Sequence, residues 1–123
     1  MKVVYTSEIV EKQCTSIKQA KKLFGGDMRL VQSLFSRITA LEQATVLKDI
    51  INTPSFHFHH LKNKKGKNLE GYFAIDVKSR KDAWRLILQP LNTMYEPFDP
   101  CLIHEIAKIV QIVEISEVSK HYE

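Results

Sequence analysis

The chain has 123 residues, of which 44% are hydrophobic and 26% charged, and its formal net charge at pH 7 is +4. This composition is typical of one globular domain and excludes a disordered, highly charged chain. No apolar stretch reaches the roughly 20 residues that cross a bilayer, and the N-terminus carries acidic residues where a signal peptide is apolar. We therefore expect a single cytoplasmic domain over residues 1–123, without membrane contact.

The first residues predict a strand followed by a helix. KVVYT, residues 2–6, has the composition of a short strand. Ser7 is a suitable N-cap for a helix whose apolar residues recur at helical spacing as far as Phe24. Gly25-Gly26 then supplies the C-terminal stop of this helix.

A second helix follows, and together the two helices predict an antiparallel hairpin. Asp27 is its N-cap, and apolar residues over 30–41 form one broad face. A Gly-Gly turn this short is typical of antiparallel neighbours. Residues 45–52 predict a further turn or two, and Thr53-Pro54 ends the helical region because a residue before proline disfavours helical dihedrals.

From Phe56 onward the hydrophobic period changes to two, which is typical of strands. It predicts a meander of three antiparallel strands, over residues 56–60, 72–77 and 84–89. Residues 90–100 hold three of the four prolines, so we predict an irregular loop there and not a central strand. The remaining elements are a short helical turn over 102–106 and a last strand over 109–115.

This order, β-α-α-β-β-β-β, predicts an α+β fold with a two-helix hairpin packed on one face of a mostly antiparallel sheet. Strand parity places three polar side chains on the opposite, open face: His57, His59 and Arg85. Because Phe58 and Leu61 cannot share a face of a regular strand, we expect a bulge or the end of the strand near His59-His60.

The positive charge is concentrated in one part of the chain. Residues 57–85 contain eight basic and three acidic side chains, whereas the rest of the chain contains 10 basic and 11 acidic ones. Such a segment attracts a polyanion through steering and counterion release. A solvated lysine face that keeps the protein soluble is the alternative interpretation.

The histidines and cysteines raise the question of a metal. His57 and His59 share a strand face, and His104 or Cys101 could complete a zinc site. No four-ligand spacing is present, so we expect neither a metal nor another cofactor. Cys14 and Cys101 form no CxxC pair or disulfide framework, and we expect both to be reduced thiols.

Four motifs follow one another along the chain: His59-His60-Leu61-Lys62 with a basic, glycine-containing turn, the strand Gly71-Tyr72-Phe73-Ala74-Ile75, the strand Trp84-Arg85-Leu86-Ile87-Leu88, and a final IVEIS strand with a histidine in the tail. In this order they resemble the HigB/RelE-type toxins of type II toxin-antitoxin systems, the plasmid maintenance killer proteins of the RelE/ParE superfamily. The resemblance covers nearly the whole chain. It implies a RelE-like fold and an endoribonuclease that enters the ribosomal A site and cuts mRNA during translation.

The resemblance also implies site residues. It places the histidine of the H-x-L-K motif at His59, the arginine of the W-R strand at Arg85 and the tail histidine at His121. RNA cleavage by the substrate's own 2′-hydroxyl requires a base, an acid and cations on the phosphate. We hypothesise that His59 and His121 share the acid and base roles. In the same hypothesis Arg85 and Lys62 hold the scissile phosphate, and Tyr122 stacks on a base or assists proton transfer.

A second set of residues is predicted to bind phosphates of the ribosome and mRNA without reading sequence: His57, Lys62, Lys64, Lys65, Lys67 and Arg80. The resemblance further implies a HigA-like helix-turn-helix antitoxin that forms a hetero-oligomer with the chain, with operator DNA bound only through that partner. Two other functions remain open. They are a ParE-like gyrase poison, which shares the fold, and a non-enzymatic RNA-binding regulatory module.

Overall fold

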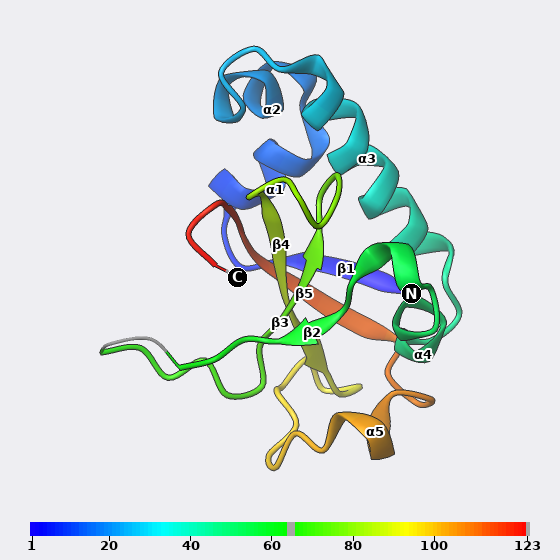
Figure 1. The fold of residues 1–123 in the computed structure, drawn as a ribbon. Helices are drawn as coiled ribbons and strands as arrows, with labels where there is room; N and C mark the ends of the chain where they lie inside the picture. The colour runs from blue at the N-terminus through cyan, green and yellow to red at the C-terminus, as the bar shows by residue number, and fades with distance from the viewer. Residues whose placement is uncertain (64–65, 123) are drawn as a thin grey trace.

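The computed structural model describes residues 1–63 and 66–122. They form an α+β fold with a mixed five-stranded sheet in the order β1-β5-β4-β3-β2 (Figure 1). No helix in these residues is long and apolar enough to cross a bilayer. The elements are β1 (Lys2–Tyr5), α1 (Glu8–Thr15), α2 (Ile17–Leu23), α3 (Met28–Gln43), α4 (Leu47–Ile51), a 3₁₀-helix η1 (Pro54–Phe56), β2 (His59–His60), β3 (Phe73–Asp76), β4 (Arg85–Leu91), α5 (Ile103–Ile106) and β5 (Ile112–Ser119).

The predicted meander is confirmed. β2 pairs with β3, β3 with β4 and β4 with β5, all antiparallel. β1 lies at the other edge and pairs with β5 in parallel. The sheet is therefore mostly antiparallel, as expected, and β2 is its exposed edge at the histidine-rich segment.

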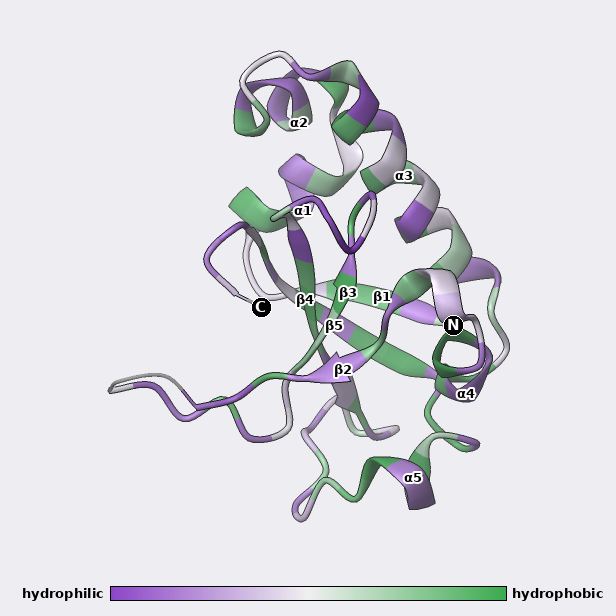
Figure 2. Cartoon of the chain, in the orientation of Figure 1, coloured by the Kyte–Doolittle hydropathy of each residue, from purple (hydrophilic) through white to green (hydrophobic). Residues whose placement is uncertain are grey.

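The core lies between one face of the sheet and helices α1 to α4. Alternate strand residues such as Phe73, Ile75, Leu86 and Leu88 pack there, against helix residues that include Leu34. A smaller apolar cluster lies on the opposite face: Leu61, Leu69, Ala74, Ile87 and Tyr122. β3 and β4 are mostly hydrophobic, whereas β2 is hydrophilic, and the described parts of the β2–β3 connection (residues 61–63 and 66–72) are mostly polar and extend away from the body of the fold (Figures 1 and 2).

The first predicted helix is in fact two helices, because the chain leaves the helical region at Ser16. This residue is extended (φ −114°, ψ 122°), and its hydroxyl accepts a hydrogen bond from the Gln19 amide at 3.3 Å. Serine side chains compete with the helical backbone in this way, so Ser16 ends α1 and caps α2. Ile17, the first residue of α2, is exposed, although it continues the helical spacing of the apolar residues.

The predicted ends of the last two strands are wrong. β4 continues through Pro90 to Leu91, and β5 covers 112–119 instead of 109–115. Proline is tolerated because the β3 pairing stops at Leu88, so only the β5 side of the strand is paired at Pro90. A register shift between Ile87 and Leu88 leaves Ser116 without a partner in β4, and β5 continues past it to Ser119. The predicted turn over 102–106 is confirmed as α5.

Candidate active site

A cavity of about 420 Å³ brings together many of the predicted site residues. It lies beside the edge strand β2 and the start of the β2–β3 connection, and the C-terminal tail contributes one wall. Its lining residues are His57, His59, His60, Leu61, Lys62, Asn63 and Tyr122. The charged, titratable and aromatic side chains needed for phosphate chemistry therefore share one cavity.

His57 does not belong to a strand, contrary to the predicted alternation from Phe56. The 3₁₀-helix closes when the His57 amide donates to the Pro54 carbonyl at 3.0 Å. His57 itself has left-handed dihedrals (φ 50°, ψ 51°), which cost a non-glycine residue roughly 1–2 kcal/mol. Such strain is concentrated at functional sites. Phe58 packs on the helix-side core and Leu61 on the other face, so β2 needs no bulge and ends at His60.

The His57 ring is held by a buried carboxylate. Its Nδ1 lies 3.1 Å from Oδ1 of Asp76, which is only 1% exposed. The same Oδ1 lies 3.3 Å from Nε of Arg85 in an ion pair. Because an ionised carboxylate only accepts hydrogen bonds, Nδ1 of His57 carries the hydrogen, and the neutral ring has its lone pair on Nε2.

Arg37, a residue of α3, holds the backbone around His57 and Asp76 in place. Arg37 Nε donates to the Asp76 carbonyl at 2.9 Å, and its Nη2 donates to the Ser55 carbonyl at 3.3 Å. The guanidinium also lies over the Phe56 ring, 4.5 Å from its centroid. Partial burial lowers the pKa of Arg37, and the Asp76 charge acts in the opposite direction. α3 thus ties the 3₁₀-helix to β3 directly beneath His57.

His59 stacks on His57, with ring centroids 4.4 Å apart and planes inclined by 27°. Its Nδ1 lies 2.7 Å from the His57 carbonyl oxygen. A carbonyl only accepts, so Nδ1 of His59 is the protonated nitrogen and the lone pair of its neutral ring is also on Nε2. Two imidazoles of the same tautomer, fixed by two different acceptors, therefore line the same cavity.

Tyr122 connects the tail to the β2–β3 connection. Its ring is buried in the smaller apolar cluster, and Lys67 Nζ donates to its hydroxyl at 2.7 Å. This hydrogen bond raises the pKa of Lys67, with a further electrostatic contribution from Tyr122. Lys62 is exposed and lines the same cavity as Tyr122. A cation and a phenol therefore border the imidazole pair.

Arg85 lies on the predicted face of the sheet, but its predicted exposure is wrong. We expected it to be exposed on the open face, but it is only 7% exposed. Its Nη1 donates to the Trp84 carbonyl at 2.9 Å and to that of Asp82, and its Nη2 donates to the Arg80 carbonyl at 3.1 Å. The guanidinium therefore holds the β3–β4 turn and its Asp76 pair, and it is not presented to a phosphate in the cavity.

Other predicted residues are dispersed. His121 is exposed, its amide donates to the Ser119 hydroxyl at 3.1 Å, and its side chain is not part of the cavity lining given above. Arg80 and Lys67 are exposed on separate connections. Lys64 and Lys65 fall outside the described residues. The cavity thus gathers His57, His59, Lys62 and Tyr122, but not Arg85 or His121.

Asp76 is the site residue that sequence reasoning missed. It alternates with Phe73, Ile75 and Val77 along an otherwise apolar segment, so parity alone places it on the face of His59. A single carboxylate at that position could have been flagged as a partner for a histidine. What parity could not supply is the turn at His57 that brings its ring onto the carboxylate.

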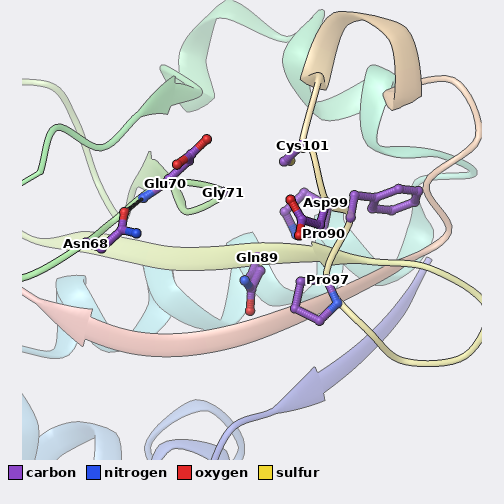
Figure 3. A pocket seen from close by; sticks show the side chains of 9 residues that line it. Asn68, Glu70, Gly71, Gln89, Pro90, Pro97, Asp99 and Cys101 are labelled. Carbon is purple, nitrogen blue, oxygen red and sulfur yellow. Dashed lines mark hydrogen bonds between the residues drawn. The ribbon is translucent and has the colours of Figure 1, made fainter.

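A second cavity, of about 260 Å³, has different chemistry (Figure 3). The carboxylates of Glu70 and Asp99 and the amides of Asn68 and Gln89 surround it, and the Glu70 amide donates to the Asn68 side chain at 3.0 Å. Its lining residues include neither a histidine nor a cation. This arrangement would repel a phosphate, so we place the site at the histidine cavity.

The zinc alternative finds no support in the geometry of residues 1–63 and 66–122. No three His, Cys, Asp or Glu side chains among them are arranged to hold a metal ion. His104 and Cys101 line a different cavity, together with His60. The two histidines of the proposed ligand pair each use Nδ1 for a protein acceptor.

The two cysteines should differ in reactivity. Both thiols are free, but Cys14 is buried, and burial raises its pKa to about 12. Cys101 is half-buried, and burial, with the Glu70 charge, raises its pKa as well. At about pH 8, we expect a disulfide reagent to modify Cys101 slowly and Cys14 only on unfolding, with the Cys101 rate increasing with pH because the thiolate is the nucleophile. Rapid modification of a Cys101→Ser variant in the native state would contradict this placement.

Comparison with known proteins does not identify a relative. No protein-family model matches the chain, and neither a curated protein nor a solved structure is significantly similar to it.

Proposed function

We propose that this protein is the toxin of a type II toxin-antitoxin system, with a RelE-like fold, that cleaves mRNA on the ribosome without a metal. The observation that carries the proposal is the stacked pair His57 and His59 in a cavity that also contains Lys62 and Tyr122. The mostly antiparallel sheet of the α+β fold and the basic excess over residues 57–85 are compatible with the family resemblance. A HigA-like antitoxin remains the expected partner.

The proposed reaction is an intramolecular transesterification. A base removes the proton of the 2′-hydroxyl, whose oxygen attacks the adjacent phosphorus. The bond from phosphorus to the 5′-oxygen breaks, and an acid donates a proton to that oxygen. The products are a 2′,3′-cyclic phosphate and a 5′-hydroxyl end, so atoms and charge balance with one proton accepted and one donated.

The cavity supplies a group for each role. An imidazole suits both proton transfers because its unperturbed pKa is about 6.5, close to the working pH. The fixed tautomers leave Nε2 as the proton-accepting nitrogen of both His57 and His59, so one neutral and one protonated ring would provide the base and the acid. Lys62 provides positive charge for the phosphorane, and the Tyr122 ring provides an aromatic wall on which a base can stack.

The cavity geometry changes the assignment of two residues. We propose that His57 replaces His121 as the partner of His59, because His57 and His59 are in contact and His121 is outside the cavity lining. Arg85 is proposed to support the site through Asp76 and the β3–β4 turn. The exposed cations Lys62, Lys67 and Arg80 keep their predicted role as contacts to phosphates, which carry no sequence information.

The test is primer extension on an mRNA in a purified translation system, with and without ribosomes. We expect wild-type protein to produce cuts only when ribosomes translate the message, and the double variant His57→Asn/His59→Ala to produce none. His104→Ala, which removes an exposed histidine of α5, should cut like wild type.

Intact mRNA in every lane would contradict the proposal, and two further measurements would then assign the rivals. Double-strand DNA breaks formed with gyrase would indicate a gyrase poison. Salt-sensitive ribosome binding without cleavage or DNA damage would indicate a binding module.

A further inference from the structure

We propose that Asp76 is a positioning residue that holds His57 in the tautomer and orientation of the catalytic base. This inference rests on the proposed function and deepens it, because it distinguishes the roles of the two imidazoles. Nothing in the family resemblance assigned a role to this carboxylate. Asp76 is buried, lies beside Arg85 and Arg37, and faces the left-handed residue His57.

The position of Asp76 is fixed from three sides. Its Oδ1 lies 3.1 Å from Nδ1 of His57 and 3.3 Å from Nε of Arg85, and its carbonyl accepts from Arg37 at 2.9 Å. The side chain is 2% exposed, so it has no contact with bulk water that could replace these partners. A carboxylate in these surroundings can neither rotate freely nor reach the substrate, and it can act only through His57.

The two imidazoles differ in the group that accepts the hydrogen of Nδ1. His59 donates to a neutral carbonyl, whereas His57 donates to a carboxylate. When a ring accepts a proton from the 2′-hydroxyl it becomes a cation, and a carboxylate at Nδ1 stabilises that cation more than a carbonyl does. In the proposed reaction the unprotonated Nε2 of His57 accepts the proton of the 2′-hydroxyl, Asp76 stabilises the imidazolium that forms, and the stacked His59 donates a proton to the 5′-oxygen.

Arg85 holds the Asp76 side chain in place opposite His57. The guanidinium pairs with the same oxygen and is anchored by carbonyls of the β3–β4 turn. The guanidinium therefore prevents Asp76 from turning away from His57. The left-handed backbone of His57 is then accounted for, because an extended residue there would follow the strand and carry its ring past Asp76.

The first measurement needs no RNA. Nitrogen-15 NMR of the wild-type histidines, with the His57 signals identified by their loss in His57→Asn, reports which ring nitrogen is protonated. We expect a protonated Nδ1 and an unprotonated Nε2 in the neutral ring. The opposite tautomer in the wild type would overturn the inference, whatever the cleavage assay shows.

The second measurement uses Asp76→Asn, whose amide can donate to Nδ1 and so invert the tautomer. We expect an inverted His57 tautomer and a fall in kcat of about 10²–10⁴-fold with a small change in KM. In a His57→Asn background the same change should alter the remaining rate by no more than roughly twofold, because Asp76 acts only through His57. A folded Asp76→Asn variant with wild-type kcat would overturn the inference.

Removing one partner of a buried pair can prevent folding. The variant Asp76→Asn/Arg85→Gln removes both charges of the buried pair. Its kcat and its His57 tautomer can then be compared with those of wild type in place of the values for Asp76→Asn. Failure of the proposed function gives a different pattern, in which wild type does not cleave although His57 shows the expected tautomer. The NMR result in wild type decides the placement of Asp76 even if neither variant folds.

Discussion

His57→Asn should lower the rate of ribosome-dependent cleavage by about 10²–10⁴-fold and leave stability nearly unchanged. The rate falls because the substitution removes an imidazole of the cavity and its Nε2. Stability is preserved because asparagine tolerates left-handed dihedrals better than most residues, and the native φ at this position is 50°. The buried pair of Asp76 and Arg85 also stays intact. Single-turnover cleavage and urea unfolding of the same preparation measure the two effects.

Matched histidine variants make this prediction specific. His59→Ala should show a loss of similar size, and His104→Ala should show none. His121→Ala distinguishes between the two assignments of the second catalytic histidine. The cavity geometry, which assigns His57, predicts a cleavage rate close to wild type, whereas the family resemblance, which assigns His121, predicts a large loss. A full rate for His57→Asn together with an inactive His121→Ala would return the catalytic role to the tail.

Arg85→Ala should lower the free energy of unfolding by about 3–5 kcal/mol, which is the typical cost of removing one partner of a buried ion pair. The substitution leaves the Asp76 carboxylate buried without its cation and leaves turn carbonyls, such as those of Arg80 and Trp84, without their donor. Arg85→Lys should recover only part of the loss, because an ammonium group cannot reproduce the guanidinium fork. Denaturant unfolding followed by circular dichroism measures the change.

The neighbouring Arg80→Ala is the control for stability. Its side chain is exposed and its carbonyl is retained by alanine, so we expect a change within about 0.5 kcal/mol. An Arg85→Ala variant as stable as wild type, but defective in cleavage, would show that Arg85 contacts the substrate and would contradict the role given to it by its burial.

The parts of the fold that could be predicted from sequence are those that depend on local pattern. Alternation in segments 72–77 and 84–89 identified the paired strands, and Asp27 identified the start of α3. The break at Ser16 and the continuation of β4 through Pro90 depend instead on the surrounding elements of the fold. A serine inside an amphipathic pattern is compatible with either one helix or two, and a proline is excluded from a strand only where both edges are paired.

The site also has some features that follow from local sequence and others that depend on contacts between distant residues. The histidines and Lys62 were found because their residue types suit the chemistry, and they come from one short segment. The burial of Arg85 could not be read from parity, because it depends on a turn whose carbonyls fold back onto the guanidinium. Likewise His57 reaches Asp76, 19 residues away, only through the left-handed residue after η1.

The most direct test of the central claim is the chemistry of the RNA ends at ribosome-dependent cuts. If His57 and His59 perform acid and base catalysis on the 2′-hydroxyl, the upstream fragment made by wild type should end in a 2′,3′-cyclic phosphate and the downstream fragment in a 5′-hydroxyl. The fragments should be missing with His57→Asn/His59→Ala. Upstream fragments that end in a 3′-hydroxyl, or cuts that persist in the double variant, would contradict the account.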